Sequence, residues 1–142
     1  MALSFVIVGN KELVYECRLA AGANQQDQAH VHQFVMHSAL DMVEERMWQT
    51  NGMYLRVVDE FNELQVHAWV AANGGKLLFL HQSIAEDSGR RSRLEEHVRS
   101  FFEEVNDLYT KIVLNPFYEQ DQPIDSKVFD SRVRTIATKW GF

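Results

Sequence analysis

Two short segments of this chain are apolar on both faces of an extended backbone, and they constrain the fold more than any other feature. They are Leu3–Val8 and Lys76–His81, and positions 77–80 of the second are all leucine or phenylalanine. Successive side chains of a strand point to opposite faces, so such a strand is fully buried only where both faces of its sheet are covered. We therefore expect both segments to be central strands with helices packed on either side.

Three further segments have the composition of strands, and turn residues show how they connect. Leu13–Leu19 follows the first strand across the turn residues of Gly9–Lys11, which predicts a hairpin. Met53–Asp59 and Glu63–Ala71 precede the last strand, and Asn73-Gly74-Gly75 is a hairpin turn whose residues tolerate positive φ. Joining the hairpin to this meander through the two apolar strands gives an antiparallel sheet in the order 2-1-5-4-3.

Helical periodicity appears in three stretches of the chain. The first runs from about Asp27 to Trp48, the second carries a broad apolar stripe over Leu94–Val113, and the last covers Val128–Trp140. A polar loop is expected over Gln82–Ser92, and Pro116 ends the second helix. One helix then covers one face of the sheet and two cover the other. Since no repeat or linker interrupts the pattern, the fold class is α/β (α+β) with a single domain over residues 1–142.

Charge and cysteine content exclude several classes of protein. The net charge of −6 argues against a general nucleic-acid binder, which needs clustered Lys and Arg. A single cysteine, Cys17, permits no internal disulfide, is expected in the core, and fits a reducing compartment. The N-terminus has no basic n-region, and no segment approaches the ~20 apolar residues of a membrane span. We expect a cytosolic protein, at most peripheral to membranes.

The sequence contains no recognisable set of catalytic, cofactor-binding or metal-binding residues. Gly-rich phosphate loops and nucleophile elbows are missing. His67 and His81 lie on adjacent strands, share a face only in one hairpin register, and lack a third ligand. The competing hypothesis is a profilin-like small-molecule sensor or enzyme with a pocket near His67, His81 and Trp69.

Asp41 is the unusual residue of the first helix, because aspartate is a poor residue for a helix interior. It lies on the same side as Phe34 and Ser38. One interpretation is an exposed charge paired with His37 or Arg46. The other is a polar contact at a partner surface.

Two other motifs allow more than one interpretation. Arg90, Arg91 and Arg93 lie in the polar loop or open the following helix, and are either solvated or contact anionic lipid or an acidic partner. Asn115-Pro116-Phe117-Tyr118 has the form of an endocytic sorting signal. Because it links two apolar helices, we expect Phe117 and Tyr118 to be packed instead.

Short runs along nearly the whole chain resemble the sedlin family, whose members are small subunits of the TRAPP vesicle-tethering complex. Each run is weak alone, but together and in order they are specific. They are Ser4–Gly9, Gln33-Phe34, His37–Val43, Met47-Trp48, Asn51–Leu55, Val58–Glu63, Leu80-His81, Asp107–Tyr109, Asn115–Glu119, Pro123-Ile124 and Phe129-Asp130. The Met47-Trp48 and Met53–Leu55 runs favour sedlin proper over the sister, sedlin-like TRAPP subunit. The segment Ser83–His97 is longer than the family usually carries.

The resemblance implies a longin-like fold and a non-enzymatic role in endoplasmic reticulum to Golgi transport. It implies an adaptor for complex assembly that is cytoplasmic and peripheral to these membranes, and no cofactor. The expected partners are other TRAPP subunits and SNARE or adaptor proteins, with a Rab GTPase contacted indirectly, since the whole complex performs nucleotide exchange. The family's functionally sensitive helix aspartate falls on Asp41, and the candidate partner-binding residues are Asp41, Phe34, Ser38 and Glu45.

Overall fold

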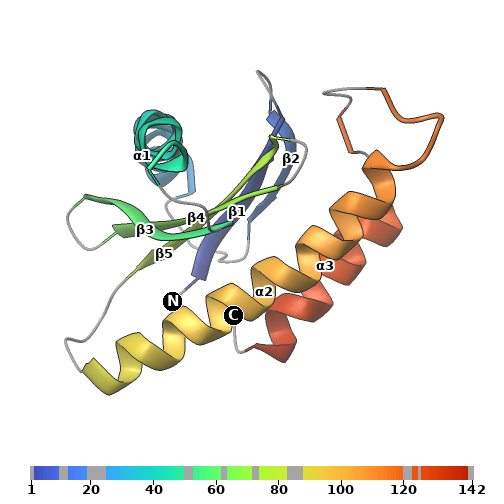
Figure 1. Ribbon diagram of the computed structural model, residues 1–142. Helices are drawn as coiled ribbons and strands as arrows, with labels where there is room; N and C mark the ends of the chain where they lie inside the picture. The colour runs from blue at the N-terminus through green and yellow to red at the C-terminus, as the bar shows by residue number, and fades with distance from the viewer. Residues whose placement is uncertain are drawn as a thin grey trace.

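The computed structural model contains five strands and three helices among the residues that it describes (Figure 1). These are residues 2–9, 13–18, 25–49, 53–61, 64–71, 74–82, 88–119, 123–124 and 126–140. The elements follow one another as β1 (Ala2–Val8), β2 (Leu13–Arg18), α1 (Gln25–Met47), β3 (Tyr54–Phe61), β4 (Leu64–Val70), β5 (Lys76–Gln82), α2 (Ser88–Val113) and α3 (Lys127–Lys139).

The sheet has the order β2-β1-β5-β4-β3, and every pair of neighbouring strands is antiparallel. This is the predicted order, with the two doubly apolar strands β1 and β5 at the centre. The predicted turn between β4 and β5 is also confirmed where the structure describes it. Gly74 has a φ of 88°, and its N–H donates to the carbonyl of Ala71 at 3.0 Å. A residue without a Cβ adopts this φ at no steric cost.

Of the three helices that the structure describes, only α1 lies on the first face of the sheet (Figure 1). Its buried side chains Val35, Ala39 and Val43 recur at four-residue intervals and pack on inward-facing residues of the strands. The sheet side of this layer includes Val66, Ala68, Leu78 and Leu80.

Helices α2 and α3 lie side by side on the opposite face, as the sequence predicts (Figure 1). Aromatic rings fill this second core layer, where Phe101 and Phe102 of α2 meet Phe5 and Phe79 with centroid separations of 5.2 to 6.4 Å. Helix α3 contributes the buried residues Phe129, Val133 and Ala137. Both faces of β1 and β5 are therefore covered, which confirms the expected layering of a longin-like fold.

The beginning of α2 differs from the expected loop. The helix begins at Ser88, so it includes the last residues of the predicted Gln82–Ser92 loop and most of the long Ser83–His97 segment. Residues 83–87 lie outside the described part of the chain. The polar composition concealed this end of the helix because it contains no apolar residues at helical spacing. The run Arg90, Arg91 and Arg93 therefore lies in the first turns of α2 and not in a preceding loop. The sequence alone is compatible with both positions.

The packing expected for Phe117 is wrong. The chain leaves α2 at Val113 and turns outward, so that Phe117 is 91% exposed, whereas Tyr118 is half-buried. Apolar character alone does not place a loop residue in the core, since a folded protein exposes much apolar surface.

Candidate partner-binding surfaces

The predicted partner-binding residues lie together on the outer face of α1. Phe34 is 64% exposed, Asp41 and Glu45 are exposed, and Ser38 is partly exposed. Their spacing places them along the side of the helix that faces away from the buried stripe of Val35, Ala39 and Val43. The structure thus brings the four residues onto one accessible surface, which we call the α1 face.

Trp48 extends the α1 face and was missed by the sequence analysis as a site residue. It follows directly on α1, and 84% of its surface is exposed. The available signal was its position three residues after Glu45, which continues the same side of the helix. Trp, with Arg and Tyr, is among the residues that most often dominate binding energy at protein interfaces.

Two contacts fix the C-terminal half of α1 on the sheet. Arg46 Nη1 donates to the carbonyl of Val57 at 2.7 Å, and Lys76 Nζ lies 3.8 Å from Glu44 Oε1. Arg46 is thereby directed toward β3 and not toward Asp41. Among the described residues, Asp41 forms no ion pair with either His37 or Arg46, so the paired-charge interpretation has no support. The α1 face presents the Asp41 and Glu45 carboxylates between exposed aromatic side chains.

The two strand histidines share one face of the sheet, beneath α2. The register places His67 opposite Phe79 and Gln65 opposite His81, which puts both histidines on the side of the aromatic core. Burial, and secondly the charge of His81, lower the pKa of His67 to about 4. Burial likewise lowers the pKa of His81 to about 4. Both rings are therefore neutral near pH 7.

These histidines and Trp69 belong to the core and not to a ligand pocket. The exposed fractions of His67, Trp69 and His81 are 1%, 7% and 8%. The Tyr54 hydroxyl lies 3.3 Å from His67 Nδ1, and Trp69 packs on Phe102. In the described part of the chain, no group of three or more His, Cys, Asp or Glu side chains could hold a metal ion. The geometry gives the small-molecule sensor hypothesis no accessible site here.

The lone cysteine lies in the core, as predicted. Cys17 is 1% exposed, and burial raises the pKa of its thiol. A protonated, buried thiol is a poor nucleophile.

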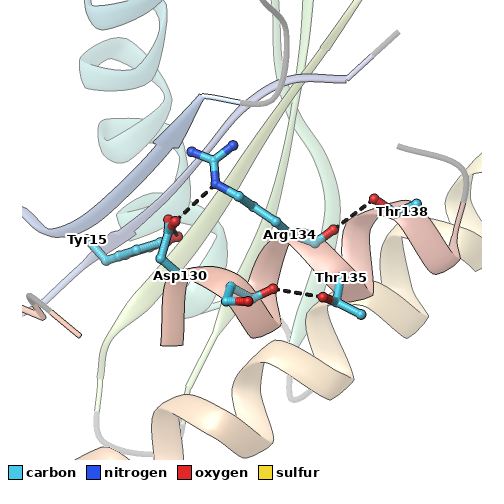
Figure 2. A network of polar contacts seen from close by, with 6 residues as sticks. Tyr15, Asp130, Arg134, Thr135 and Thr138 are labelled. Atoms are coloured by element: carbon cyan, nitrogen blue, oxygen red, sulfur yellow. Dashed lines mark hydrogen bonds and ion pairs between the residues drawn. The ribbon is translucent and has the colours of Figure 1, made fainter. Parts of the chain in front are cut away.

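A polar network joins β2 to the first turns of α3 (Figure 2). The Tyr15 hydroxyl donates to Asp130 Oδ1 at 2.6 Å, and Arg134 Nε donates to Asp130 Oδ2 at 3.0 Å. The Tyr15 hydrogen bond is the largest of the effects that lower the pKa of Asp130, ahead of the hydrogen bond and the charge of Arg134. Burial and the Asp130 carboxylate raise the pKa of Tyr15. The network holds the N-terminal end of α3 against the edge strand.

Comparison with known proteins agrees with the geometry. The family model described as Sedlin matches residues 6–139. This chain belongs to the sedlin family. The resemblance inferred from short runs of residues is therefore confirmed.

Several curated proteins align with most of this chain, two of them over nearly the full length of both sequences. The chain is 33% identical to the "Transport protein particle 20 kDa subunit" of Schizosaccharomyces pombe, over 94% of this chain and 95% of that protein. It is 32% identical to the "Trafficking protein particle complex subunit 20" of Saccharomyces cerevisiae, over 95% of each. The "Trafficking protein particle complex subunit 2-like protein" of Xenopus tropicalis is 26% identical over 72% of this chain and 76% of that protein. The similarity is thus greater to the first two than to a protein of the 2-like type.

No helix in the described part of the chain has both the length and the apolar character needed to cross a membrane.

Proposed function

We propose that this protein is a non-catalytic subunit of the TRAPP vesicle-tethering complex and acts as an adaptor in its assembly. The names of the relatives that align over nearly their full length support membership of such a complex. The exposed α1 face supports an adaptor role, because it offers aromatic anchors and carboxylates that no described residue neutralises. In this role the protein serves endoplasmic reticulum to Golgi transport from the cytoplasmic side of these membranes. It supports Rab nucleotide exchange only through the whole complex.

The observation that carries the proposal is the arrangement of Phe34, Asp41 and Trp48 on the α1 face. Apolar side chains that are 64% and 84% exposed flank an Asp41 carboxylate without an ion-pair partner among the described residues. Such a surface complements a basic, apolar patch on another subunit or on a SNARE or adaptor protein.

The test is Asp41→Tyr in the full chain, with Glu96→Tyr as the matched control. Both positions are exposed carboxylates on helices, but Glu96 lies on α2, on the opposite side of the sheet. We expect both variants to fold with unchanged melting temperature. Asp41→Tyr alone weakens binding of a partner subunit in a purified complex, by about tenfold.

Two outcomes would contradict the proposed role. In the first, the Asp41→Tyr variant unfolds, which would make Asp41 a structural residue. In the second, the variant folds and assembles with every partner as the wild type does. Equal loss in the Glu96→Tyr variant would show a nonspecific effect of the added tyrosine.

A further inference from the structure

Most of the large apolar side chains that are exposed in the described part of the chain lie in two places, one of which is the α1 face. The second lies where α2 ends and α3 begins. Here Leu114, Phe117 and Val128 are 75%, 91% and 64% exposed. Large apolar residues exposed singly need no explanation, but neighbouring ones mark an interaction surface.

The antiparallel pairing of the two helices places Leu114 and Val128 at the same end of the layer that α2 and α3 form. Glu104 of α2 contacts the end of α3, since Lys139 Nζ lies 2.8 Å from its Oε1 and Trp140 Nε1 lies 3.0 Å from its Oε2. The helices run antiparallel (Figure 1). Leu114 is ten residues beyond Glu104, and Asp130 is ten residues before Trp140. Leu114 and Asp130 therefore lie at about the same height along the helix axes. Val128 is about 3 Å further along, at the ~1.5 Å rise per residue of a helix.

Phe117 is held outward by a rigid turn. Its N–H donates to Asn115 Oδ1 at 3.0 Å, and the Tyr118 N–H donates to the Asn115 carbonyl at 3.0 Å. Asn at the first position and Pro at the second are the residues that favour such a turn. A side chain presented on an ordered turn loses little conformational entropy on binding, which suits it to be an anchor.

A hollow of about 500 Å³ adjoins this surface, between β2 and the start of α3. Its apolar lining includes Leu13, which is 50% exposed, with Pro123 and Ile124. Lys127, next to Val128, forms part of its rim. A bound segment therefore has both a protruding anchor and a recess to occupy.

The charges beside the surface determine the kind of partner. Lys111, Lys127 and Arg132 are exposed, and none of them forms an ion pair with another residue in the described ranges. Two carboxylate residues, Glu16 and Asp130, line the hollow. Asp130 already interacts with Arg134 and Tyr15, and Glu16 also has an interaction of its own. The surface thus offers three cations for carboxylates of a partner, whereas the α1 face offers carboxylates.

We propose that Leu114, Phe117 and Val128 form a second docking surface, on the opposite side of the sheet from the α1 face, for an acidic and apolar segment of a partner protein. A protein is favoured over a membrane by two features. The chain has a net charge of −6, and recognition of anionic lipid takes roughly four to eight clustered Lys or Arg. The proposal goes beyond membership of the TRAPP complex, because it gives the subunit two faces of opposite charge that hold different partners at once.

The test compares two matched aromatic truncations in the native complex, isolated through a tag on the full chain. Phe117→Ala removes the anchor of the second surface, and Trp48→Ala removes a similarly exposed aromatic side chain from the α1 face. Hydroxyl-radical footprinting measures oxidation of Phe117 in the free chain and in the complex. We expect severalfold protection of Phe117 on assembly and about a tenfold loss of affinity for one subunit in Phe117→Ala. Trp48→Ala retains that subunit.

A charge variant tests the chemistry of the partner. Lys127→Glu weakens the same subunit contact as Phe117→Ala, and raised salt weakens the wild-type contact in parallel. Equal oxidation of Phe117 in the free and assembled chain overturns the proposal, as does a Phe117→Ala complex with its full set of subunits. Binding to vesicles of equal parts phosphatidylcholine and phosphatidylserine that depends on Phe117 also overturns it, in favour of a membrane. These outcomes leave the Asp41→Tyr result, and hence the proposed function, unaffected.

Discussion

At the scale of single residues, the environment of His67 shows how the core sets side-chain chemistry. The ring lies on the face of β4 beneath α2, 1% exposed, and contacts Phe79 with a centroid separation of 6.2 Å. Its Nε2 is buried without a hydrogen-bond partner among the described residues. Protonation would place a charge in this apolar layer, so the folded state favours the neutral ring.

The stability of the protein is therefore expected to fall in mild acid. The pKa of His67 is 6.5 when unfolded and about 4 when folded, so the unfolded state binds more protons between these values. The contribution of the neutral His67 ring to the free energy of unfolding is complete above pH 6.5 and is lost as the pH falls toward 4. Each such histidine adds about 1.4 kcal/mol per pH unit to the slope of the free energy of unfolding against pH in this range.

Chemical denaturation across this pH range measures the effect. His67→Phe reduces the slope of the free energy of unfolding by about 1 kcal/mol per pH unit, whereas Ser38→Ala, at a partly exposed position of α1 without a titratable side chain, leaves it unchanged. The explanation is wrong if the two variants have the same slope as the wild type.

At the scale of the elements, α3 depends on a contact far away in the sequence. Tyr15 of β2 and Asp130 of α3 are 115 residues apart, and their hydrogen bond is 2.6 Å long. The Ser126 hydroxyl caps the same end of the helix by accepting from the Phe129 N–H at 3.3 Å. The first turn of α3 is thus held both by its own cap and by the edge strand, whose contact with Asp130 is drawn in Figure 2.

Tyr15→Phe tests how far the edge strand stabilises α3. It removes a hydrogen bond to a carboxylate at a partly exposed site, so the free energy of unfolding is expected to fall by about 1 kcal/mol. The pKa of Asp130, observed by NMR titration of its carboxyl group, moves up toward its ordinary value, because the Tyr15 hydrogen bond is the main effect that lowers it. Thr135→Ala removes only an exposed bond to the Ser131 carbonyl and is the control. An unchanged pKa of Asp130 in Tyr15→Phe would refute the assignment.

The elements also show which features the sequence could predict. Strand order followed from the doubly apolar strands β1 and β5, since central burial is the only arrangement that covers both of their faces. The start of α2 at Ser88 was missed, because a polar helix end has no periodic apolar signal. The shared face of His67 and His81 depends on a one-residue choice of register. The exposure of Phe117 depends on where the chain turns after α2, which apolar character does not determine.

At the scale of the whole molecule, one sheet separates two core layers that share its central strands. Val6, Leu78 and Leu80 face α1, whereas Phe5, Leu77 and Phe79 face α2 and α3. Because both core layers pack on the same central strands, neither layer can unfold the sheet without disrupting the other. A chain with this arrangement is expected to unfold in one cooperative transition, as the single domain predicted from the sequence would.

Matched substitutions on the two sides of the sheet test this cooperativity. Val43 of α1 and Val105 of α2 are both 0% exposed, so replacement of either by alanine removes the same buried methyl groups. Each change is expected to lower the free energy of unfolding by about 2 kcal/mol. Because the sheet lies between the two sites, the double variant loses the sum within about 0.5 kcal/mol. Denaturation followed by far-ultraviolet circular dichroism and by tryptophan fluorescence gives one coincident transition in all four proteins. Separate transitions, with Val43→Ala shifting only the first, would instead show that α1 and its layer unfold independently, and that the α1 face can be remodelled without disturbing the surface at the end of α2.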